Sequence, residues 1–411
     1  MNKIKLMVLA IIAATVNLSA QIPSGYYNDA AGQTGTQLRQ TLHNIIDNHY
    51  SQSYTSLWTH FRDTDKKSNN KVWDMYSDVP GGTPPYEFSF VTDQCGSYQS
   101  EGDCYNREHS FPKSWFNEEA PMYTDLFHLI PTDGYVNQQR GNYVYGEVKN
   151  AFWVSENGSK LGISGFSNMT GTVFEPIDEY KGDFARIYFY MSTRYMNEDD
   201  GWYTTSLFDG ADLTNTGVAL LMKWHKQDPV SQKELDRNEA IYDIQNNRNP
   251  FVDHPEFAQA IWGDINIPPY FVTIIPNQTL KEGEEVNLEI AFVDNAPQEV
   301  DITINCVFCT ADFATVTQTS DTLYNLNLAP QSGDAGTYQI GISANDGVNS
   351  STNYLIDVNI EEENSIVDPT EFFNISPSFT NNYFNISSTK SYMSKTTFTV
   401  YTITGQVVER F

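Results

Sequence analysis

Residues 104–115 read Cys-Tyr-Asn-Arg-Glu-His-Ser-Phe-Pro-Lys-Ser-Trp and carry the adjacent pair Glu108 and His109. Neighbouring side chains on a strand point to opposite faces, so this pair can serve one site only at a strand end or an irregular turn. Pro112 favours such a strand end. A carboxylate suits a hard cation such as Mg²⁺, and a neutral imidazole can deprotonate water near pH 7. The stretch therefore predicts a catalytic site, although a histidine beside a glutamate is by itself more often structural.

Residues 125–147 supply a second polar segment, which reads Asp-Leu-Phe-His-Leu-Ile-Pro-Thr-Asp-Gly-Tyr-Val-Asn-Gln-Gln-Arg-Gly-Asn-Tyr-Val-Tyr-Gly-Glu. A helix that starts near Asp133 places Asn137 and Arg140 three residues apart, on one face. That face offers an amide oxygen to a metal ion and a guanidinium to a phosphate. We therefore expect Asn137 to join Glu108 and His109 in one site.

The N-terminal residues 1–20 read as a secretory signal peptide. Lys3 and Lys5 precede an apolar run that ends in the small residues Ser19 and Ala20. No later stretch approaches about 18 consecutive apolar residues, so no membrane span is expected. The mature protein is expected to start near Gln21 and to be secreted or held at the cell surface.

The charge balance narrows the classes of function. The formal charge is −28, from 24 basic and 52 acidic residues, and the acidic surplus is spread over the whole chain. A protein that holds DNA by counterion release usually presents a basic face. The composition therefore argues against tight sequence-specific DNA binding, while an enzyme that turns over abundant substrate can use a local basic strip.

Four cysteines form two close pairs, Cys95 with Cys104 and Cys306 with Cys309. Disulfides are expected in an exported protein. A zinc site joining the two pairs would have to span two domains, and a redox role for the second pair has little support. A Cys95–Cys104 bond would close a ten-residue segment just before the catalytic strand and brace it.

Residues 21–265 read as an α+β domain in which helices dominate. Leu38 and Leu42 belong to an early helix with apolar residues at helical spacing, and Asp183 is expected to cap a helix over 184–195. Further helices are expected over 217–225, 233–245 and 256–262.

Residues 268–361 have the texture of a β-sandwich, which begins after the Pro268-Pro269 pair. The segment from Asp334 to Tyr338 resembles the turn and tyrosine before a late strand of immunoglobulin-like domains. The expected strands cover 272–275, 286–292, 301–306, 337–343 and 353–360.

Residues 362–411 are expected to form a charged linker and a short β-rich tail. The tail resembles the C-terminal sorting domain of type IX secretion in its opening at 375–378 and in the turn at 401–406, which implies contact with the secretion machinery or the cell surface. It departs from that pattern because the chain stops at Phe411 before a further strand and a basic end. A plain adhesive β module is the alternative.

Segments 106–115 and 125–147 together resemble the endonuclease I family of periplasmic and secreted nucleases. The resemblance covers residues 21–265 and extends to ordered blocks further along the domain. It implies a ββα-metal (His-Me finger-like) active site, set in a mainly helical domain around a small sheet. The additional blocks are 174–176, 180–191, 236–239 and 246–251.

The resemblance also implies roles for individual residues. His109 activates water and must be neutral to do so, which predicts lower activity at acid pH. Glu108 and Asn137 hold a single divalent cation, Mg²⁺ with Ca²⁺ or Mn²⁺ as alternatives, which leaves 5′-phosphate and 3′-hydroxyl ends. Arg107 and Arg140 are candidates for gripping phosphate.

Two further residues have more than one interpretation. Arg186 is another candidate for gripping phosphate, but it could equally be a structural ion-pair residue. His128 matches a family position, but it could also only pack and hydrogen-bond near the site. Some family members place a phosphate-stabilising arginine in an insertion that this sequence does not match.

The expected function is non-specific endonucleolytic cleavage of DNA, RNA or both. A glycosidase using two of the many carboxylates is a rival with almost no specific support. The other rival is a non-enzymatic cell-surface adhesin built on a degenerate nuclease scaffold. The sequence does not decide between DNA and RNA, because backbone contacts do not read bases.

Overall fold

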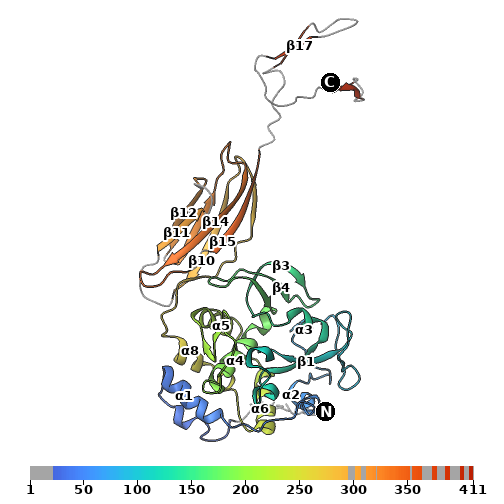
Figure 1. Ribbon diagram of the computed structural model, residues 1–411, viewed down its shortest axis with the longest axis vertical. Coiled ribbons are helices and arrows are strands. Elements are labelled where there is room, and N and C mark those ends of the chain that lie inside the picture. The colour runs from blue at the N-terminus through green and yellow to red at the C-terminus, as the bar shows by residue number, and fades with distance from the viewer. Residues whose placement is uncertain are drawn as a thin grey trace, which may run out of the picture.

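The computed structural model describes residues 22–294, 301–306, 312–320, 322–351 and 354–362, together with four short strands further along the chain. The expected signal peptide, residues 1–20, lies outside the described residues. Figure 1 shows a helical unit that contains the N-terminal part of the chain and a unit of long strands that follows it. Within the described residues, no helix is long and apolar enough to cross a membrane.

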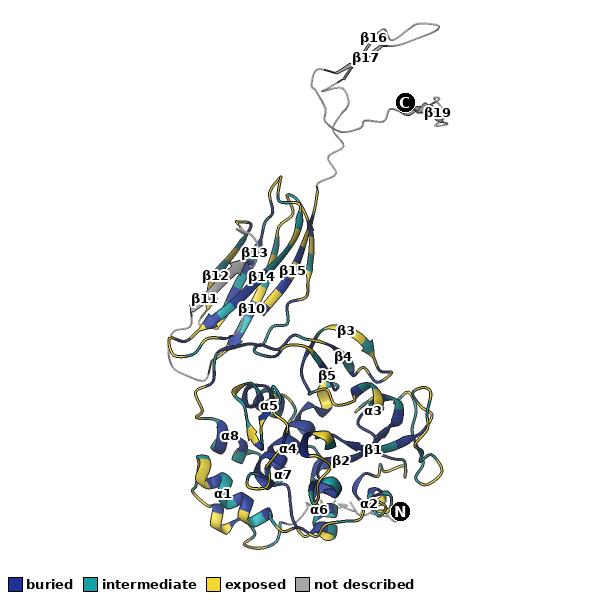
Figure 2. Ribbon diagram, viewed as in Figure 1, coloured by how far each residue is buried: buried dark blue, intermediate teal, exposed yellow. Residues whose placement is uncertain are grey.

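The long helix α4 (Asp178–Arg194) forms the centre of the first unit, and nearly every residue of it is buried (Figure 2). Helix α4 begins at Asp178, so the expectation that Asp183 caps it was wrong. Pro176 precedes the helix, and acidic residues in its first turn complement the helix dipole. Asp183 instead occupies an interior position in the sequence of α4, and its side chain forms an ion pair with Lys233.

The helices that surround α4 follow the apolar spacing of the sequence. Helices α5 (Asn215–Gln227), α6 (Gln232–Gln245) and α8 (Glu256–Trp262) confirm the expected ones, and α1 (Gly35–Ile46) confirms the early helix. Ser231 and Glu234 form a capping box at the start of α6. The remaining helical segments are α2 (Leu57–Thr64), α3 (Gly134–Arg140), α7 (Pro250–Asp253), η1 (Asn28–Ala30), η2 (Lys113–Phe116) and η3 (Met122–Thr124).

Small antiparallel sheets complete the first unit and confirm its α+β class. Strands β1 (Tyr105–His109) and β2 (Leu129–Asp133) form one pair. A second sheet has the order β3-β4-β5, from Val148–Val154, Lys160–Ser164 and Thr172–Glu175. Strands β6 (Phe208–Asp209) and β7 (Asp212–Leu213) form a short hairpin.

The second unit consists of two four-stranded sheets with the orders β12-β13-β10-β8 and β11-β14-β15-β9. Tyr338 Oη donates a hydrogen bond of 2.7 Å to Asp334 O, across the turn that the sequence singled out. The strand expected over 272–275 was wrong, because the chain pairs two residues earlier, as β8. The strands are β8 (Tyr270–Phe271), β9 (Gln278–Lys281), β10 (Val286–Val293), β11 (Asp301–Cys306), β12 (Ala314–Ser320), β13 (Leu323–Leu328), β14 (Gly336–Asn345) and β15 (Tyr354–Glu361).

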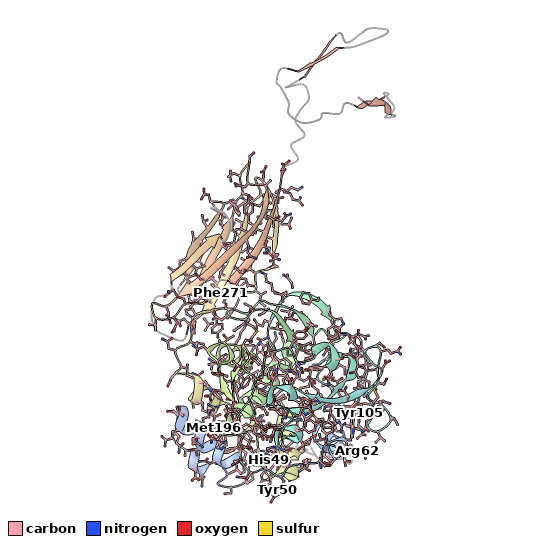
Figure 3. All side chains as sticks on the ribbon, viewed as in Figure 1. His49, Tyr50, Arg62, Tyr105, Met196 and Phe271 are labelled. Carbon is pink, nitrogen blue, oxygen red and sulfur yellow. A yellow bond between two sulfur atoms is a disulfide. The ribbon has the colours of Figure 1, made fainter. Side chains whose placement is uncertain are left out.

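Strand β8 joins the two units. Its two residues alternate, so that Tyr270 packs into the first core and Phe271 into the second. The Phe271 amide, in the residue labelled in Figure 3, donates to Ser167 Oγ at 2.8 Å. Lys149 Nζ also donates to the carbonyl of Leu355 across the junction. These contacts fix the two units against one another.

The described parts of the tail are two strand pairs. Strands β16 (Phe373–Ser376) and β17 (Asn385–Ser388) form one pair, and β18 (Thr399–Tyr401) and β19 (Val407–Arg410) form the other. The segments that connect these strands lie outside the described residues. The sorting function of the tail stays a prediction.

Candidate active site

Two strands and a helix form the scaffold of the site. In the β1–β2 pair, Glu108 lies opposite Ile130 and His109 opposite Leu129, at the end of β1. Helix α3 follows β2 directly, and the Asp133 side chain accepts a hydrogen bond from the amide of Val136. The expected strand end and the expected helix start near Asp133 are both confirmed.

Glu108 lies buried on the face of β1 that looks toward α3. Its Oε1 accepts hydrogen bonds of 3.1 Å from Tyr76 Oη and from Arg140 Nη1. Burial raises the pKa of Glu108 to about 7, against the opposing effect of the Arg140 charge. A second positive charge beside the other oxygen, Oε2, would therefore favour the ionised form of Glu108.

Arg140 is completely buried, which differs from its expected role as a phosphate ligand. Besides Glu108, its guanidinium donates to the carbonyls of His109 and Ser110 and to Tyr188 Oη. These contacts hold Arg140 underneath the strand end. The geometry therefore makes Arg140 a residue that positions Glu108 and the backbone of His109, and not one that reaches a substrate.

Asn137 lies half-buried on α3, close to Asn106 on β1. Its Nδ2 donates to Asn106 Oδ1 at 2.7 Å, and among the described residues its amide oxygen accepts no hydrogen bond, so this oxygen can bind a cation. Glu108 Oε2 and this amide oxygen are hard oxygen ligands of the kind that Mg²⁺ prefers, with water filling its remaining positions. The residues present therefore fit such a cation. No group of three or more His, Cys, Asp or Glu able to hold a metal occurs within the described part of the chain.

His109 lies on the opposite face of β1, in an aromatic pocket. Its Nε2 is 3.1 Å from the carbonyl oxygen of Tyr123, and because a carbonyl only accepts, Nε2 carries the proton. Nδ1 is therefore the basic nitrogen. Burial lowers the pKa of His109 to about 3, and the charges of neighbouring His128, Lys113 and Arg107 act in the same direction. The imidazole is thus neutral at physiological pH.

His128 lies next to His109, with 5.5 Å between the ring centres. It is fully buried, and its Nε2 is 2.6 Å from the carbonyl of Met122. This position matches the interpretation in which His128 only packs and hydrogen-bonds near the site.

Arg107 lies on the same face of β1 as His109. Its guanidinium carbon is 3.6 Å from the centre of the Tyr54 ring and 4.4 Å from that of Trp58, so the planar group is held between two aromatic rings. Its Nη1 donates to the carbonyl of Tyr54 at 2.7 Å. The side chain is only half-buried, so its remaining donors can reach a phosphate.

Arg186 lies in the interior, away from this face. It is fully buried, and its Nη2 donates to Glu234 Oε2 at 2.8 Å. A further hydrogen bond of 2.8 Å runs from Nη1 to the carbonyl of Asp228. The structural ion-pair interpretation of Arg186 fits this position, and the phosphate-gripping one does not.

The structure adds residues that the sequence did not single out. Lys113, in η2, is 43% exposed and lies over the Tyr123 ring. Tyr76 bonds Glu108, and Tyr54 stacks against Arg107. Lys113 could have been noticed because it stands four residues after His109. The tyrosines come from a distant segment and had no such signal.

The Cys95–Cys104 disulfide is present, as the sequence predicted. Cys95 N donates to the carbonyl of Tyr105, the first residue of β1, at 3.1 Å. The closed segment also places the Tyr98 ring against Gly134, where a Cβ would lie 2.5 Å from a ring carbon. The disulfide therefore ties this segment to both β1 and the start of α3. The expected Cys306–Cys309 bond lies outside the residues whose side chains are described.

Comparison with known proteins gives a consistent result over the first unit. The Endonuclease I family model matches residues 34–256. The extracellular ribonuclease of Bacillus amyloliquefaciens is 39% identical over 246 residues, which cover 58% of this chain and 78% of that protein. The extracellular ribonuclease of Bacillus subtilis (strain 168) is 36% identical over 247 residues, with the same coverage. The extracellular deoxyribonuclease of Aeromonas hydrophila is 26% identical over 188 residues, which cover 46% of this chain and 68% of that protein.

Proposed function

The chain belongs to the endonuclease I family, and from this premise we propose that it is an exported nuclease that hydrolyses internal phosphodiester bonds at the site around His109. The relatives named extracellular ribonuclease and extracellular deoxyribonuclease support nucleic acid as the substrate and a location outside the cytoplasm. The two most similar of these relatives are ribonucleases, so RNA is the first substrate to test, with DNA beside it.

The observation that carries the proposal is the orientation of His109. Its Nε2–H is committed to the carbonyl of Tyr123, and burial keeps the ring neutral. Nδ1 is then free to take a proton from a water molecule as that water attacks the phosphorus. The aromatic pocket fixes the ring plane, so the base is already oriented before the substrate arrives.

Glu108 and Asn137 would hold a divalent cation, Mg²⁺ or alternatively Ca²⁺ or Mn²⁺. Bound there, such a cation supplies charge stabilisation to the scissile phosphate and to the leaving O3′. Arg140 and Tyr76 orient the Glu108 carboxylate through its Oε1. Cleavage of the P–O3′ bond leaves a 5′-phosphate and a 3′-hydroxyl.

Arg107 and Lys113 are the cationic side chains that can meet the substrate phosphate. Both act electrostatically on His109, and both are partly exposed. We assign the phosphate grip to Arg107 because its planar guanidinium can donate two parallel hydrogen bonds to phosphate oxygens. Contacts of this kind do not read bases, so cleavage is non-specific in sequence.

The second unit and the tail support roles outside catalysis. We propose that residues 268–361 form an immunoglobulin-like sandwich, supported by the Tyr338–Asp334 hydrogen bond across its turn. We also propose that the tail acts in export or surface attachment. Among the residues that the structure describes, neither part contributes a residue to the site.

A cleavage assay on plasmid DNA and on structured RNA tests the proposal. The wild type should cleave with Mg²⁺ and stop when chelator is added. His109→Ala should lower the rate at least about 100-fold, as expected for loss of a general base. His254→Ala serves as the matched control, because His254 contacts Tyr27 and Glu256 at the far side of the unit.

Two results contradict the proposal. One is cleavage that persists undiminished in His109→Ala, and the other is the absence of metal-dependent cleavage by the wild type. The second result favours the adhesin alternative. Ligation of the products without prior phosphorylation checks the assignment of 5′-phosphate ends.

A further inference from the structure

Two arginines that lack an acidic partner among the described residues lie on α2 and β1, elements that meet at the Trp58 ring. Arg62 and Arg107 have no ion pair within the described residues, in a chain with 52 acidic and 24 basic residues. Cations left unpaired in so acidic a chain suggest an anionic ligand that comes from outside it. The arginines that do form ion pairs are Arg39, Arg140, Arg186, Arg194, Arg237 and Arg248.

Helix α2 determines the direction of Arg62. The helix buries Leu57 and Phe61, and it leaves Trp58 and Arg62, which are four residues apart, on an adjoining face. The Trp58 ring packs edge-on against Tyr105 with 5.5 Å between centres. Arg62 is exposed, and its positive charge acts to lower the pKa of the Tyr105 hydroxyl. Figure 3 labels Arg62 and Tyr105 on the same side of the helical unit.

Strand β1 aligns these groups with the catalytic base. Tyr105, Arg107 and His109 alternate along one face of the strand, so they share that face. At about 3.3 Å per residue, the Tyr105 end lies roughly 13 Å from His109. The Trp58 ring contacts Tyr105 edge-on and has the Arg107 guanidinium carbon 4.4 Å from its centre. The result is a row in which two cations, Arg62 and then Arg107, lead toward the neutral base His109.

No acidic residue of the described chain forms an ion pair with Arg62 or Arg107, although Asp93 acts on the same Tyr105 hydroxyl as Arg62. Asp63, next to Arg62, acts electrostatically on His60, which lies on another face of α2. Asp65 is buried in an ion pair of 2.8 Å with Arg237. Arg62 is therefore available to an anion at the surface.

We propose that Arg62 and Arg107, together with Trp58, which we call the α2 track, guide the polynucleotide backbone, with Arg107 at the scissile phosphate and Arg62 at a backbone phosphate beside it. The track rests on the proposed nuclease function and adds the path of the substrate strand. Arg107 grips the phosphate nearest to His109, Arg62 neutralises a phosphate further along the strand, and Trp58 holds Arg107 in place. Arg62 thus binds a flanking phosphate and takes no part in bond cleavage.

Steady-state cleavage of a polynucleotide at several salt concentrations tests the track. Arg62→Gln should raise KM roughly three- to tenfold with kcat unchanged, because one phosphate contact is lost. The slope of log(kcat/KM) against log[salt] should become shallower by about 0.7–0.9. Arg62→Lys should retain most of the salt slope, because it keeps the charge.

Two controls separate the track from the general charge and from the chemistry. Lys226→Gln removes an exposed cation on α5 and should leave KM and the salt slope unchanged. Bis(p-nitrophenyl) phosphate has no flanking nucleotides, so Arg62→Gln should hydrolyse it at the wild-type rate. Both comparisons use the full chain, and thermal melting verifies that each variant is folded.

The outcomes separate the two proposals. If the wild type cleaves the polynucleotide but Arg62→Gln shows unchanged KM and salt slope, the track is overturned and the nuclease function stands. If Arg62→Gln also slows bis(p-nitrophenyl) phosphate hydrolysis, Arg62 acts on the chemistry and the track is overturned. If the wild type cleaves neither substrate, the proposed function and the track fall together.

Discussion

The buried pair of Arg186 and Glu234 allows a direct test of which arginines are structural. Arg186 donates from Nε and Nη2 to the two carboxylate oxygens of Glu234, and from Nη1 to a backbone carbonyl. Replacing Arg186 by methionine keeps much of the volume and removes the charge and these hydrogen bonds. Glu234 is then left buried without compensation, so the free energy of unfolding should fall by about 3–5 kcal/mol.

A double-mutant cycle measured by urea unfolding, followed by tryptophan fluorescence at neutral pH, checks this value. Glu234→Gln removes the partner charge while leaving an oxygen for the capping contact with Ser231. The double variant should lose about 1–3 kcal/mol less than the sum of the single losses. Among folded molecules, Arg186→Met should retain wild-type kcat and KM. A stability loss below about 1 kcal/mol, together with a many-fold lower kcat/KM, would refute the structural assignment.

Three further predictions concern other parts of the molecule. Burial, reinforced by the charge of Arg186, lowers the pKa of His225 to about 4 from its ordinary 6.5. The free energy of unfolding should therefore be highest above about pH 6.5 and fall toward pH 4, where the buried imidazole must take up a proton. In urea unfolding, His225→Gln should remove about 3 kcal/mol of this pH dependence. Cys95→Ser should lower stability by somewhat under about 3 kcal/mol and reduce cleavage, because the bond to Cys104 braces β1; full activity in this variant argues against bracing. Tyr338→Phe should cost about 1 kcal/mol by removing the hydrogen bond to Asp334 O, and an unchanged thermal midpoint would contradict that value.

The helices could be predicted where one face is buried and the other is exposed. The expected bounds of α8 match the structure, and those of α5 and α6 differ from it by a few residues. Helix α4 is buried almost all round, so its polar residues carry no information about a solvent face. Asp183 therefore looked like a cap, although its real partner is Lys233, fifty residues later. That pairing is tertiary and leaves no local pattern.

The strands of the second unit could be predicted only in part, for a related reason. Strand β12 reads Ala-Thr-Val-Thr-Gln-Thr-Ser, and its mostly polar, exposed residues resemble a loop. Strand β13 alternates buried and half-buried residues, but asparagines occupy its solvent-facing positions. Both strands are recognised only in the folded sheet, where β13 pairs with β10 and β12 pairs with β13.

The residues of the site also fall into two groups, those that a local segment predicts and those whose role depends on a distant partner. The sequence predicted that Glu108, His109 and Asn137 share a site because they lie in two short segments, and the structure places these segments in one scaffold of β1, β2 and α3. It could not assign Arg140 or Arg186, because a guanidinium binds a phosphate and a buried carboxylate equally well. The partner of each arginine lies more than thirty residues away and was visible only in the folded chain.

The alternation of β8 has a mechanical consequence. If the tail is held at a surface, any pull on it passes through the strands of the second unit to Tyr270 and Phe271 and then enters the helical unit. Tyr270 would have to leave its place beside Phe166, where the ring centres are 5.4 Å apart, before the units could separate. Gly165 lets Ile274 approach so closely that a Cβ there would lie 3.0 Å away, which adds shape to this connection. The two units should therefore behave under load as one stiff body, and the active site would keep a fixed orientation toward whatever anchors the chain.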